Sequence, residues 1–305
     1  MIYQVYKLEF LNNVHFGKNS LNDAEISFSA DTLFSALCLE AVKSGELEPL
    51  YETVQTGNLI FSDAFPYQEK TYYLPKPYFR VEAKENRGNS SEKKKIKKMK
   101  YIPAEELGAW LKGEFIPNAL SDLSELGKTG IKVSVAVRGK EEPEPYRVKY
   151  FAFNDRNGLY FIAGGTEKSL KLLENLMMGL SYSGLGGKRY SGMGRFDYTV
   201  TDVPEIIKKR LHQKASRYML LSTALPRENE LEEVLYGAEY QLVRRGGFVA
   251  SENYAEQQMR KKDLYVFAAG SCFEKTFTGN VYDVSSGGSH PVYRYAKGFF
   301  MGADV

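Results

Sequence analysis

A glycine-rich segment at residues 182–196, YSGLGGKRYSGMGRF, constrains the fold of this 305-residue chain more than any other feature. Five glycines fall within eleven residues, interleaved with basic and aromatic side chains, and no acidic residue lies between Tyr182 and Phe196. Glycine at this density is expected where the backbone adopts positive φ or lets a ligand approach closely. The segment therefore predicts a loop between two regular elements, which is either a plain connector or a binding loop.

The chemistry of the loop points to a partner that carries phosphates and bases. Free backbone N–H groups in such a loop form concave sites for anions. Lys188, Arg189 and Arg195 add positive charge, and Tyr190 can stack on a base. The P-loop pattern does not fit, because Arg189 follows Lys188, and a dinucleotide-binding loop would follow a strand rather than a helix. We expect neither a nucleotide hydrolase nor a Rossmann enzyme.

Hydrophobic periodicity predicts the elements around this loop. Residues 2–11 alternate as in a strand, and a helix begins near Asp31, with Ser29 or Asp31 as its N-cap and Gly45 as its stop. Residues 166–180 form a second predicted helix, capped by its first residue. The remaining predicted strands are 58–61, a hairpin of 149–153 and 159–163, and 196–201. This β-α-β-β-α-β order is that of a ferredoxin-like unit, to which we assign residues 1–203.

A long insertion at about residues 66–147 interrupts this unit. Prolines and tyrosines come first, then residues 84–100 with eight basic and two acidic residues, then a predicted short helix at 102–111 and a strand at 132–137. The whole chain carries a net charge of only +3, so binding of nucleic acid would depend on local patches. The lysine run either grips a nucleic acid or is a solvated loop.

The second half repeats part of this pattern. We expect a strand at 218–222, a helix at 228–236, a hairpin of 239–244 and 248–251, strands at 264–269, 273–277 and 281–284, and a glycine-rich loop at 285–291. The economical interpretation is a second, diverged ferredoxin-like domain over residues 204–305. The fold class predicted for the whole chain is α+β, with two ferredoxin-like (RRM-like) domains.

The composition of the chain bears on where the protein is found and on whether it has a membrane partner, a metal site or a cofactor. Hydrophobic residues make up 43% of the chain, which is enough for packed cores, and no run of 18 apolar residues suggests a membrane span. The N-terminus lacks the pattern of a signal peptide. Cys38 and Cys272 lie far apart in the sequence and fit reduced, buried thiols. We therefore expect a cytoplasmic protein with no membrane partner, no metal site and no cofactor.

Three segments carry a resemblance to the RAMP superfamily of CRISPR systems. They are the helix start FSADTLFSAL at residues 28–37, the loop GLGGKRYSGMGRF at 184–196, and the terminal segment GGSHPVYRYAK at 287–297. Together they look most like the fourth subunit of the type III-A Csm effector complex, an antiviral ribonucleoprotein. The resemblance implies two ferredoxin-like domains and a thumb-like insertion. It also implies a non-catalytic scaffold that holds the 5′ tag of the guide RNA (crRNA). Its protein partners would be the large polymerase-like subunit and a neighbouring backbone RAMP subunit.

The resemblance assigns RNA contact to the glycine loop, and the loops at 15–18 and 285–290 would line the same RNA path. The candidate RNA-binding residues are His15, Lys18, Gly184, Gly186, Gly187, Lys188, Arg189, Tyr190, Arg195, Arg244, Arg245, His290 and Arg294.

Other functions stay open at this stage. A metal-independent endoribonuclease that processes guide precursors needs an acid or base near neutral pH, and His15 is the best of three histidines for that role. Asp23, Glu25 and Asp31 could support metal-dependent cleavage, although Asp31 is better explained as a helix cap. A protein-only adaptor would leave the Lys188–Arg189 pair without a purpose.

Overall fold

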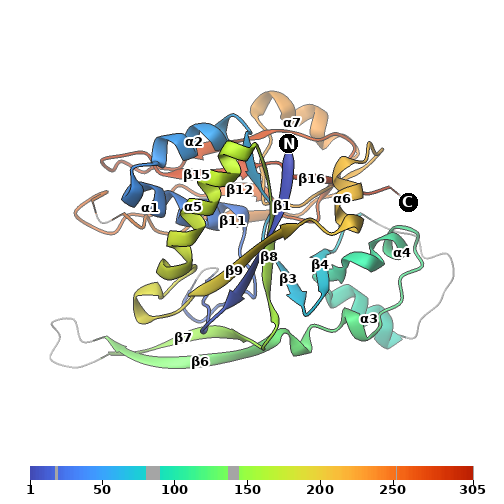
Figure 1. Ribbon diagram of the computed structural model, residues 1–305, viewed down its shortest axis with the longest axis horizontal. Coiled ribbons are helices and arrows are strands. Elements are labelled where there is room, and N and C mark those ends of the chain that lie inside the picture. Colours follow the sequence, from blue (N-terminus) through green and yellow to red (C-terminus); the bar gives the residue numbers. More distant parts are fainter. Residues whose placement is uncertain (18–19, 80–89, 137–143, 252, 305) are drawn as a thin grey trace.

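A computed structural model describes residues 1–17, 20–79, 90–136, 144–251 and 253–304, with the backbone alone for 90–93 and 136 (Figure 1). An antiparallel sheet lies at its centre. β1 (Ile2–Phe10) pairs with β8 (Asn157–Gly165) on one side and β9 (Phe196–Asp202) on the other, and β2 (Leu59–Phe61) pairs with the far side of β8. With α1 (Ala30–Ser44) and α5 (Glu167–Ser183), these elements follow the predicted β-α-β-β-α-β order.

The central strands supply two hydrophobic cores, one on each face of the sheet. Tyr6 and Leu8 of β1 pack beneath α1, α2 (Leu47–Gln55) and α5, whereas Val5 points to the opposite face. Every residue of β8 is buried, because its neighbours cover both faces. The alternation of apolar and polar side chains in residues 2–11 therefore corresponds to a strand at the centre of the sheet.

The ends of the two main helices explain where they begin and stop. Thr166 caps α5 in a capping box with Ser169, as predicted. Ser29 occupies the N-cap position of α1, and Gly45 adopts φ +74° at its C-cap. Asp31 does not cap this helix: its carboxylate is buried and paired with two arginines. The local sequence thus predicts where the helix begins and ends, but it does not predict that the Asp31 carboxylate pairs with distant arginines.

The insertion extends the sheet and adds an arm. β3 (Phe65–Gln68), β4 (Thr71–Pro75) and β5 (Tyr101–Pro103) continue the sheet order from β8 outward. α3 (Ser90–Lys98) and α4 (Leu107–Leu111) lie beside them, and Ala104–Glu106, Ala119–Ser121 and Ser124–Leu126 are short 3-10 turns. The insertion therefore has ordered structure in its described part.

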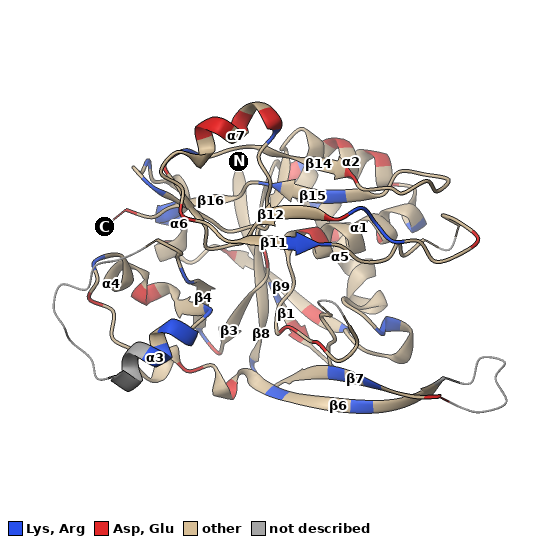
Figure 2. Cartoon of the chain, turned by 180° about the vertical axis from the view of Figure 1, so that it is seen from behind, with Lys and Arg blue, Asp and Glu red and all other residues tan. Residues whose placement is uncertain are grey.

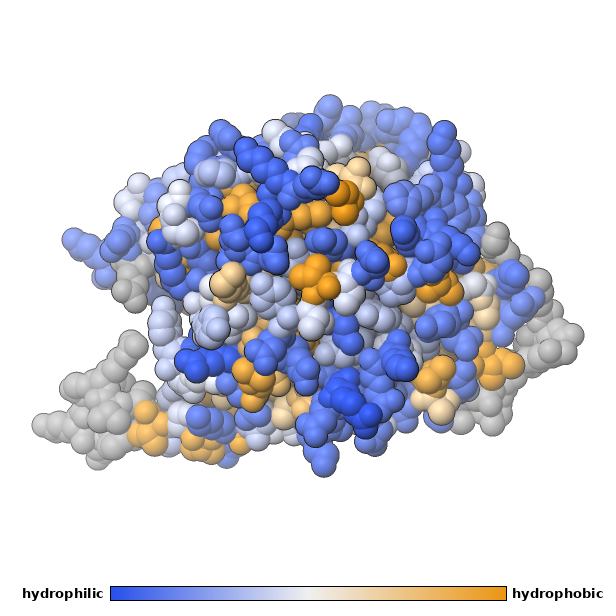
Figure 3. Space-filling view, in the orientation of Figure 1, coloured by the Kyte–Doolittle hydropathy of each residue, from blue (hydrophilic) through white to orange (hydrophobic). Residues whose placement is uncertain are grey.

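The arm of the insertion is a two-stranded hairpin of β6 (Gly127–Ala136) and β7 (Glu144–Phe153). Ile131, Val133 and Val135 alternate along β6 and are 61%, 62% and 51% exposed. Hydrophobic atoms accordingly show along this arm in Figure 3. The arm projects away from the sheet and presents an apolar face to solvent (Figure 1).

The C-terminal half contains small sheets rather than one large one in its described residues. After α6 (Glu205–His212), β10 (Tyr218–Leu220) pairs with both β13 (Cys272–Phe273) and β16 (Phe300–Gly302). The helix α7 (Glu228–Leu235) follows β10; the remaining pairs are β11 (Leu242–Arg245) with β12 (Leu264–Phe267), and β14 (Gly279–Asp283) with β15 (Tyr293–Lys297). The mixed α+β class is confirmed, while a second ferredoxin-like copy stays a prediction.

Two predicted hairpins are wrong. Residues 149–153 pair with β6 rather than with 159–163, which lie in β8 between β1 and the insertion strands. Residues 242–245 pair with 264–267, and Phe248 instead forms a single bridge with Arg260. In both cases a short turn sequence suggested that its flanking segments pair, but another strand provides the partner.

Cys272 is buried, as predicted, and Cys38 is half-buried. Neither forms a disulfide, and burial raises the pKa of each thiol to about 12. A thiol with so high a pKa stays protonated and unreactive near neutral pH. Cys38 and Cys272 are therefore packing residues.

Candidate nucleic-acid interface

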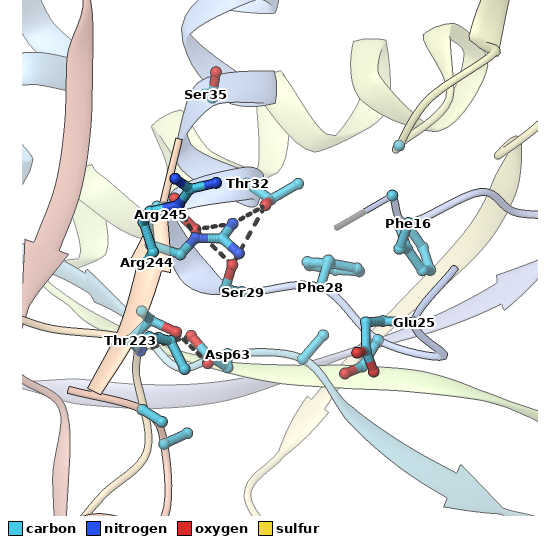
Figure 4. Close-up of a pocket in the computed structure, with 18 of the residues that line it drawn as sticks. Phe16, Glu25, Phe28, Ser29, Thr32, Ser35, Asp63, Thr223, Arg244 and Arg245 are labelled. Atoms are coloured by element: carbon cyan, nitrogen blue, oxygen red, sulfur yellow. Dashed lines mark hydrogen bonds and ion pairs between the residues drawn. The ribbon is translucent and has the colours of Figure 1, made fainter. Parts of the chain in front are cut away.

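A groove of about 1030 Å³ runs between the N-terminal unit and the β11–β12 hairpin. Its walls come from the β1–α1 loop, the start of α1, the glycine loop, the lysine-rich part of the insertion and β11. Figure 4 shows Arg245 of β11 beside the N-cap residue Ser29 and bonded to Thr32 of α1, with Phe16 and Glu25 farther along. Segments separated by more than two hundred residues thus meet at one surface.

Positive charge dominates the groove. Among the described residues that line it, three are acidic, Glu25, Asp31 and Asp63. Nine are basic: Lys76, Lys97, Lys98, Lys100, Arg189, Arg244, Arg245, Lys261 and Arg294. Figure 2 shows this basic charge on α3 and β11, whereas acidic residues gather on α7. A local basic surface exists although the net charge of the chain is only +3.

The glycine loop folds back against the β1–α1 loop. Gly187 N–H donates to the His15 carbonyl at 2.8 Å, and Gly194 N–H donates to the Asn13 carbonyl at 3.0 Å. A Cβ atom on Gly187 would lie 2.7 Å from the His15 ring, so the ring and the loop backbone touch directly. The glycines are required for this close packing as well as for the turn itself.

Most amide groups of this loop are already used inside the protein. The N–H groups of Gly184, Leu185, Ser191 and Gly192 donate to carbonyls within the same region, and that of Arg195 donates to the Asn12 side chain. The expected cradle of free amides is therefore largely absent from the described backbone. Any contact of this loop with a phosphate would therefore depend on its side chains.

His15 is 4% exposed and holds three segments together. Its Nδ1–H donates to the Lys149 carbonyl of β7 at 2.7 Å, its own carbonyl accepts from Gly187, and its ring packs against Gly17. Donation from Nδ1 leaves Nε2 as the acceptor of the neutral ring. The arrangement ties the arm and the glycine loop to the β1–α1 loop.

Lys188 and Arg189 point to different surroundings. The ammonium group of Lys188 lies 4.4 Å from the ring centroid of Tyr146 on the arm and 3.3 Å from its hydroxyl. Hydrogen bonding from Lys188 lowers the pKa of the half-buried Tyr146. Arg189, at the start of a 3-10 turn (Arg189–Ser191), lines the groove. Of this predicted pair, Arg189 is the one positioned to meet a ligand in the groove.

Arg245 and Arg294 are occupied by Asp31. Arg245 binds both carboxylate oxygens at 3.0 and 2.8 Å, and Arg294 donates to one of them at 2.6 Å. Burial alone would raise the pKa of Asp31, but the two guanidinium groups lower it to about 2. This buried cluster joins α1 to β11 and β15. All three residues line the groove.

Asp63 makes a second connection between the two halves of the chain. Its side chain accepts from the backbone N–H groups of Ala30 and Thr223 and from the Thr223 hydroxyl, at 2.6 to 2.8 Å (Figure 4). Burial raises the pKa of this carboxyl to about 6, although the hydrogen bonds act in the opposite direction. The carboxyl thus holds the start of α1 next to the segment after β10.

The structure gathers some predicted site residues and separates others. His15, Gly186, Gly187, Arg189, Arg244, Arg245 and Arg294 line the groove. Tyr190 is 97% exposed, and Arg195 and His290 are also exposed but do not line it. His290 bonds Ser251 instead, and Gly184 ends α5. Lys18 lies outside the described residues.

Several groove residues were missed by sequence reasoning. Lys76, Lys261 and Phe248 line the groove, and Tyr146 supports Lys188. Lys76, Lys261 and Tyr146 lie far along the chain from the glycine loop, and Phe248 follows Arg245 closely, but no local motif marks any of them. The lysine-rich run at residues 84–100 is evident from the sequence, and its described members Lys97, Lys98 and Lys100 lie in the groove wall.

The described residues also bear on two other classes of function, metal binding and membrane insertion. No three His, Cys, Asp or Glu side chains gather there in a way that could hold a metal ion. No helix among them has the length and apolarity needed to cross a membrane.

Comparisons with known proteins agree with one another. Residues 213–303 match the family of the CRISPR Csm4 C-terminal domain. The chain is 41% identical to "CRISPR system Cms protein Csm4" of Mycobacterium tuberculosis (strain CDC 1551 / Oshkosh), over 98% of this chain and 97% of that protein. It is 35% identical to the Streptococcus thermophilus protein of the same name, over the full length of both.

Solved structures resemble the fold. Csm4 in a crystal structure of a Csm3-Csm4 subcomplex of the type III-A CRISPR-Cas interference complex has a TM-score of 0.67 at 18% identity, covering 98% of both chains. A Csm1-Csm4 cassette in complex with AMPPNP gives 0.63 at 19% identity, covering 98% of this chain and 97% of that one. The full-length identities of 41% and 35% show the family: this chain belongs to the Csm4 family of CRISPR systems.

Proposed function

We propose that this chain is the non-catalytic RNA-binding subunit of a type III-A Csm interference complex and holds the 5′ tag of the guide RNA. The observation that carries the proposal is the groove, where Arg189 of the glycine loop faces cations from the insertion and from β11. Single-stranded RNA is bound by cationic side chains along its backbone and by side chains that stack on its bases. The groove offers both kinds of group.

The proposed partners are a Csm1-type large subunit and a Csm3-type backbone subunit. Structural neighbours of this chain were solved as Csm3-Csm4 and Csm1-Csm4 assemblies. In this proposal the chain joins the large subunit to the backbone filament and fixes the end of the guide RNA between them.

The proposed absence of catalysis rests on His15. Its ring is buried, and its Nδ1–H is committed to the Lys149 carbonyl. A general base must reach the hydroxyl that it deprotonates. A ring packed between Gly17 and Gly187 is better suited to fixing the glycine loop than to proton transfer.

The test is the double variant Lys188→Ala/Arg189→Ala. Fluorescence anisotropy with a labelled RNA of the 5′-tag sequence, at several salt concentrations, measures both affinity and its salt dependence. We expect weaker binding and a slope of log K against log[salt] that is shallower by roughly 0.7 for each lost phosphate contact.

The matched control is Lys208→Ala/Lys209→Ala, which removes two adjacent exposed lysines of α6 that do not line the groove. This control should bind the tag RNA as the wild type does. Equal affinity and equal slope for the groove variant and the wild type would contradict the proposal.

A further inference from the structure

Phe248 is an exposed aromatic side chain in the wall of the groove. It follows β11 and is 53% exposed. Tyr78, another exposed aromatic residue of the groove, is fixed by its hydroxyl, which donates to Gln241 at 2.5 Å, and by packing of its ring near Gly270. A half-exposed phenylalanine among cations offers an apolar ring face on which a base could stack.

The position of Phe248 is held by its neighbours. It forms a β-bridge with Arg260, and the flanking backbone is fixed by Val249 N–H to Met259 O and Lys261 N–H to Gly247 O, both 2.9 Å. The Arg260 guanidinium lies 5.6 Å from the ring centroid, a cation–π contact. The ring is therefore preorganised rather than free to collapse onto the surface.

Cations flank this ring on the same wall. Arg244 precedes it on β11 and is 48% exposed, with a 3.5 Å ion pair to Asp263, and Lys261 follows the bridge to Arg260. Burial and the nearby Arg294 lower the pKa of Lys261. An aromatic platform between cationic groups is the arrangement that proteins use for an unpaired nucleotide, with the base on the ring and the phosphates on the cations.

We infer that Phe248 is a stacking platform for an unpaired base of the RNA in the groove. This inference rests on the proposed function and extends it, because it assigns base contact to the C-terminal half of the chain. The glycine loop then holds the backbone on one wall, while Phe248 holds a base on the other.

The experiment compares Phe248→Ala with a matched control, Tyr265→Ala. Tyr265 lies on β12 of the same hairpin and is 61% exposed, but it does not line the groove. Binding of the full-length chain to labelled 5′-tag RNA is measured by anisotropy. We expect Phe248→Ala to weaken binding about 5- to 150-fold with an unchanged salt slope, and Tyr265→Ala to bind as the wild type does.

Two further variants separate stacking from folding. Phe248→Tyr keeps an aromatic face and should bind within about twofold of the wild type, and Phe248→Leu keeps apolar bulk and should lose affinity as the alanine variant does. Tag RNAs with 2-aminopurine at successive positions should show fluorescence quenching at one position with wild type and Phe248→Tyr only.

The outcomes are distinguishable from failure of the proposed function. If the wild-type chain does not bind tag RNA, the proposed function fails. If the wild type binds, but Phe248→Ala or Phe248→Leu binds equally well, the stacking role is overturned. A shallower salt slope in Phe248→Ala would also overturn it, because the loss would then concern a phosphate contact.

Discussion

Gly194 has no room for one additional carbon atom. Its φ is +83°, and a Cβ would lie 2.1 Å from the Leu185 carbonyl oxygen inside the glycine loop. Gly192 has a similar φ of +80°, yet nothing lies within 4 Å of its Cβ position. We expect Gly192→Ala to cost about 1–2 kcal/mol of unfolding free energy, from backbone strain alone.

For Gly194→Ala we expect about 3–5 kcal/mol, because overpacking adds to the strain. Urea denaturation of the two variants beside the wild type measures the difference. Equal losses for both variants would mean that the loop relaxes around the added methyl group.

His15 supports a separate prediction about chemistry. Since its ring holds the glycine loop, His15→Ala should lower the stability of the protein and weaken its binding of tag RNA. We expect no cleavage of RNA by either the variant or the wild type. Incubation of a repeat-containing transcript with the wild-type chain should leave the transcript intact. Cleavage by the wild type that disappears in His15→Ala would instead make this chain a nuclease with His15 as its base.

At the scale of elements, the Asp31 cluster connects α1 with two C-terminal strands. Asp31→Asn leaves the buried Arg294 and the partly buried Arg245 without their carboxylate, so we expect a loss of about 3–5 kcal/mol at pH 7. Because the pKa of Asp31 is lowered to about 2, its contribution is complete above pH 4 and fades as the pH falls toward 2. Denaturation at pH 7 and pH 3 should show the gap between variant and wild type shrinking; a constant gap would contradict this account.

Asp63 should show the opposite pH dependence. Its folded pKa of about 6 lies above the ordinary value, so the protonated form contributes stability at low pH, and this is lost as the pH rises through 6. Asp63→Asn resembles the protonated acid and keeps one acceptor oxygen. The wild type should lose about 2–3 kcal/mol more than the variant between pH 4 and pH 7. Parallel curves for the two proteins would rule out this assignment.

Predictability from sequence differed between helices and strand pairs. The caps and apolar spacing of α1 and α5 are local signals, and both helices lie where they were predicted. The predicted partners of β7 and β11 are wrong: β7 pairs with the strand before it, β6, and β11 pairs with β12 rather than with the segment that directly follows it. A turn sequence between two strands shows that the chain bends, but not that the strands pair.

At the scale of the whole molecule, the two halves share their cores. Val281 and Tyr295 of the C-terminal half are buried among α1 and α5 residues, and Met219 and Phe299 pack on the other face of the sheet. The Tyr295 side chain also bonds the Phe61 backbone in both directions. Two units with a common core are expected to unfold together.

We therefore predict one cooperative transition in urea. Fluorescence of Trp110, the single tryptophan, reports on the insertion, and far-UV circular dichroism reports on the whole chain. The two midpoints should coincide, and separated midpoints would mean that the halves unfold independently.

The candidate site was predictable only in part. The glycine loop and Arg189 were identified from sequence because their residue types are unusual and adjacent. Arg245 and Arg294 were also chosen for their charge, but the structure places them on a buried carboxylate. The charge of an arginine says nothing about whether its partner is a phosphate or an aspartate, because that depends on which segments meet in three dimensions.

The exposed face of the β6–β7 arm affects how the protein behaves at high concentration. Three large β-branched side chains in water, on β6, whose only strand partner among the described residues is β7, favour strand addition between copies. The chain expressed alone should therefore become polydisperse as it is concentrated, and co-expression with its complex should improve its yield. The apolar face of this arm therefore affects how long the free subunit stays in solution before it is assembled.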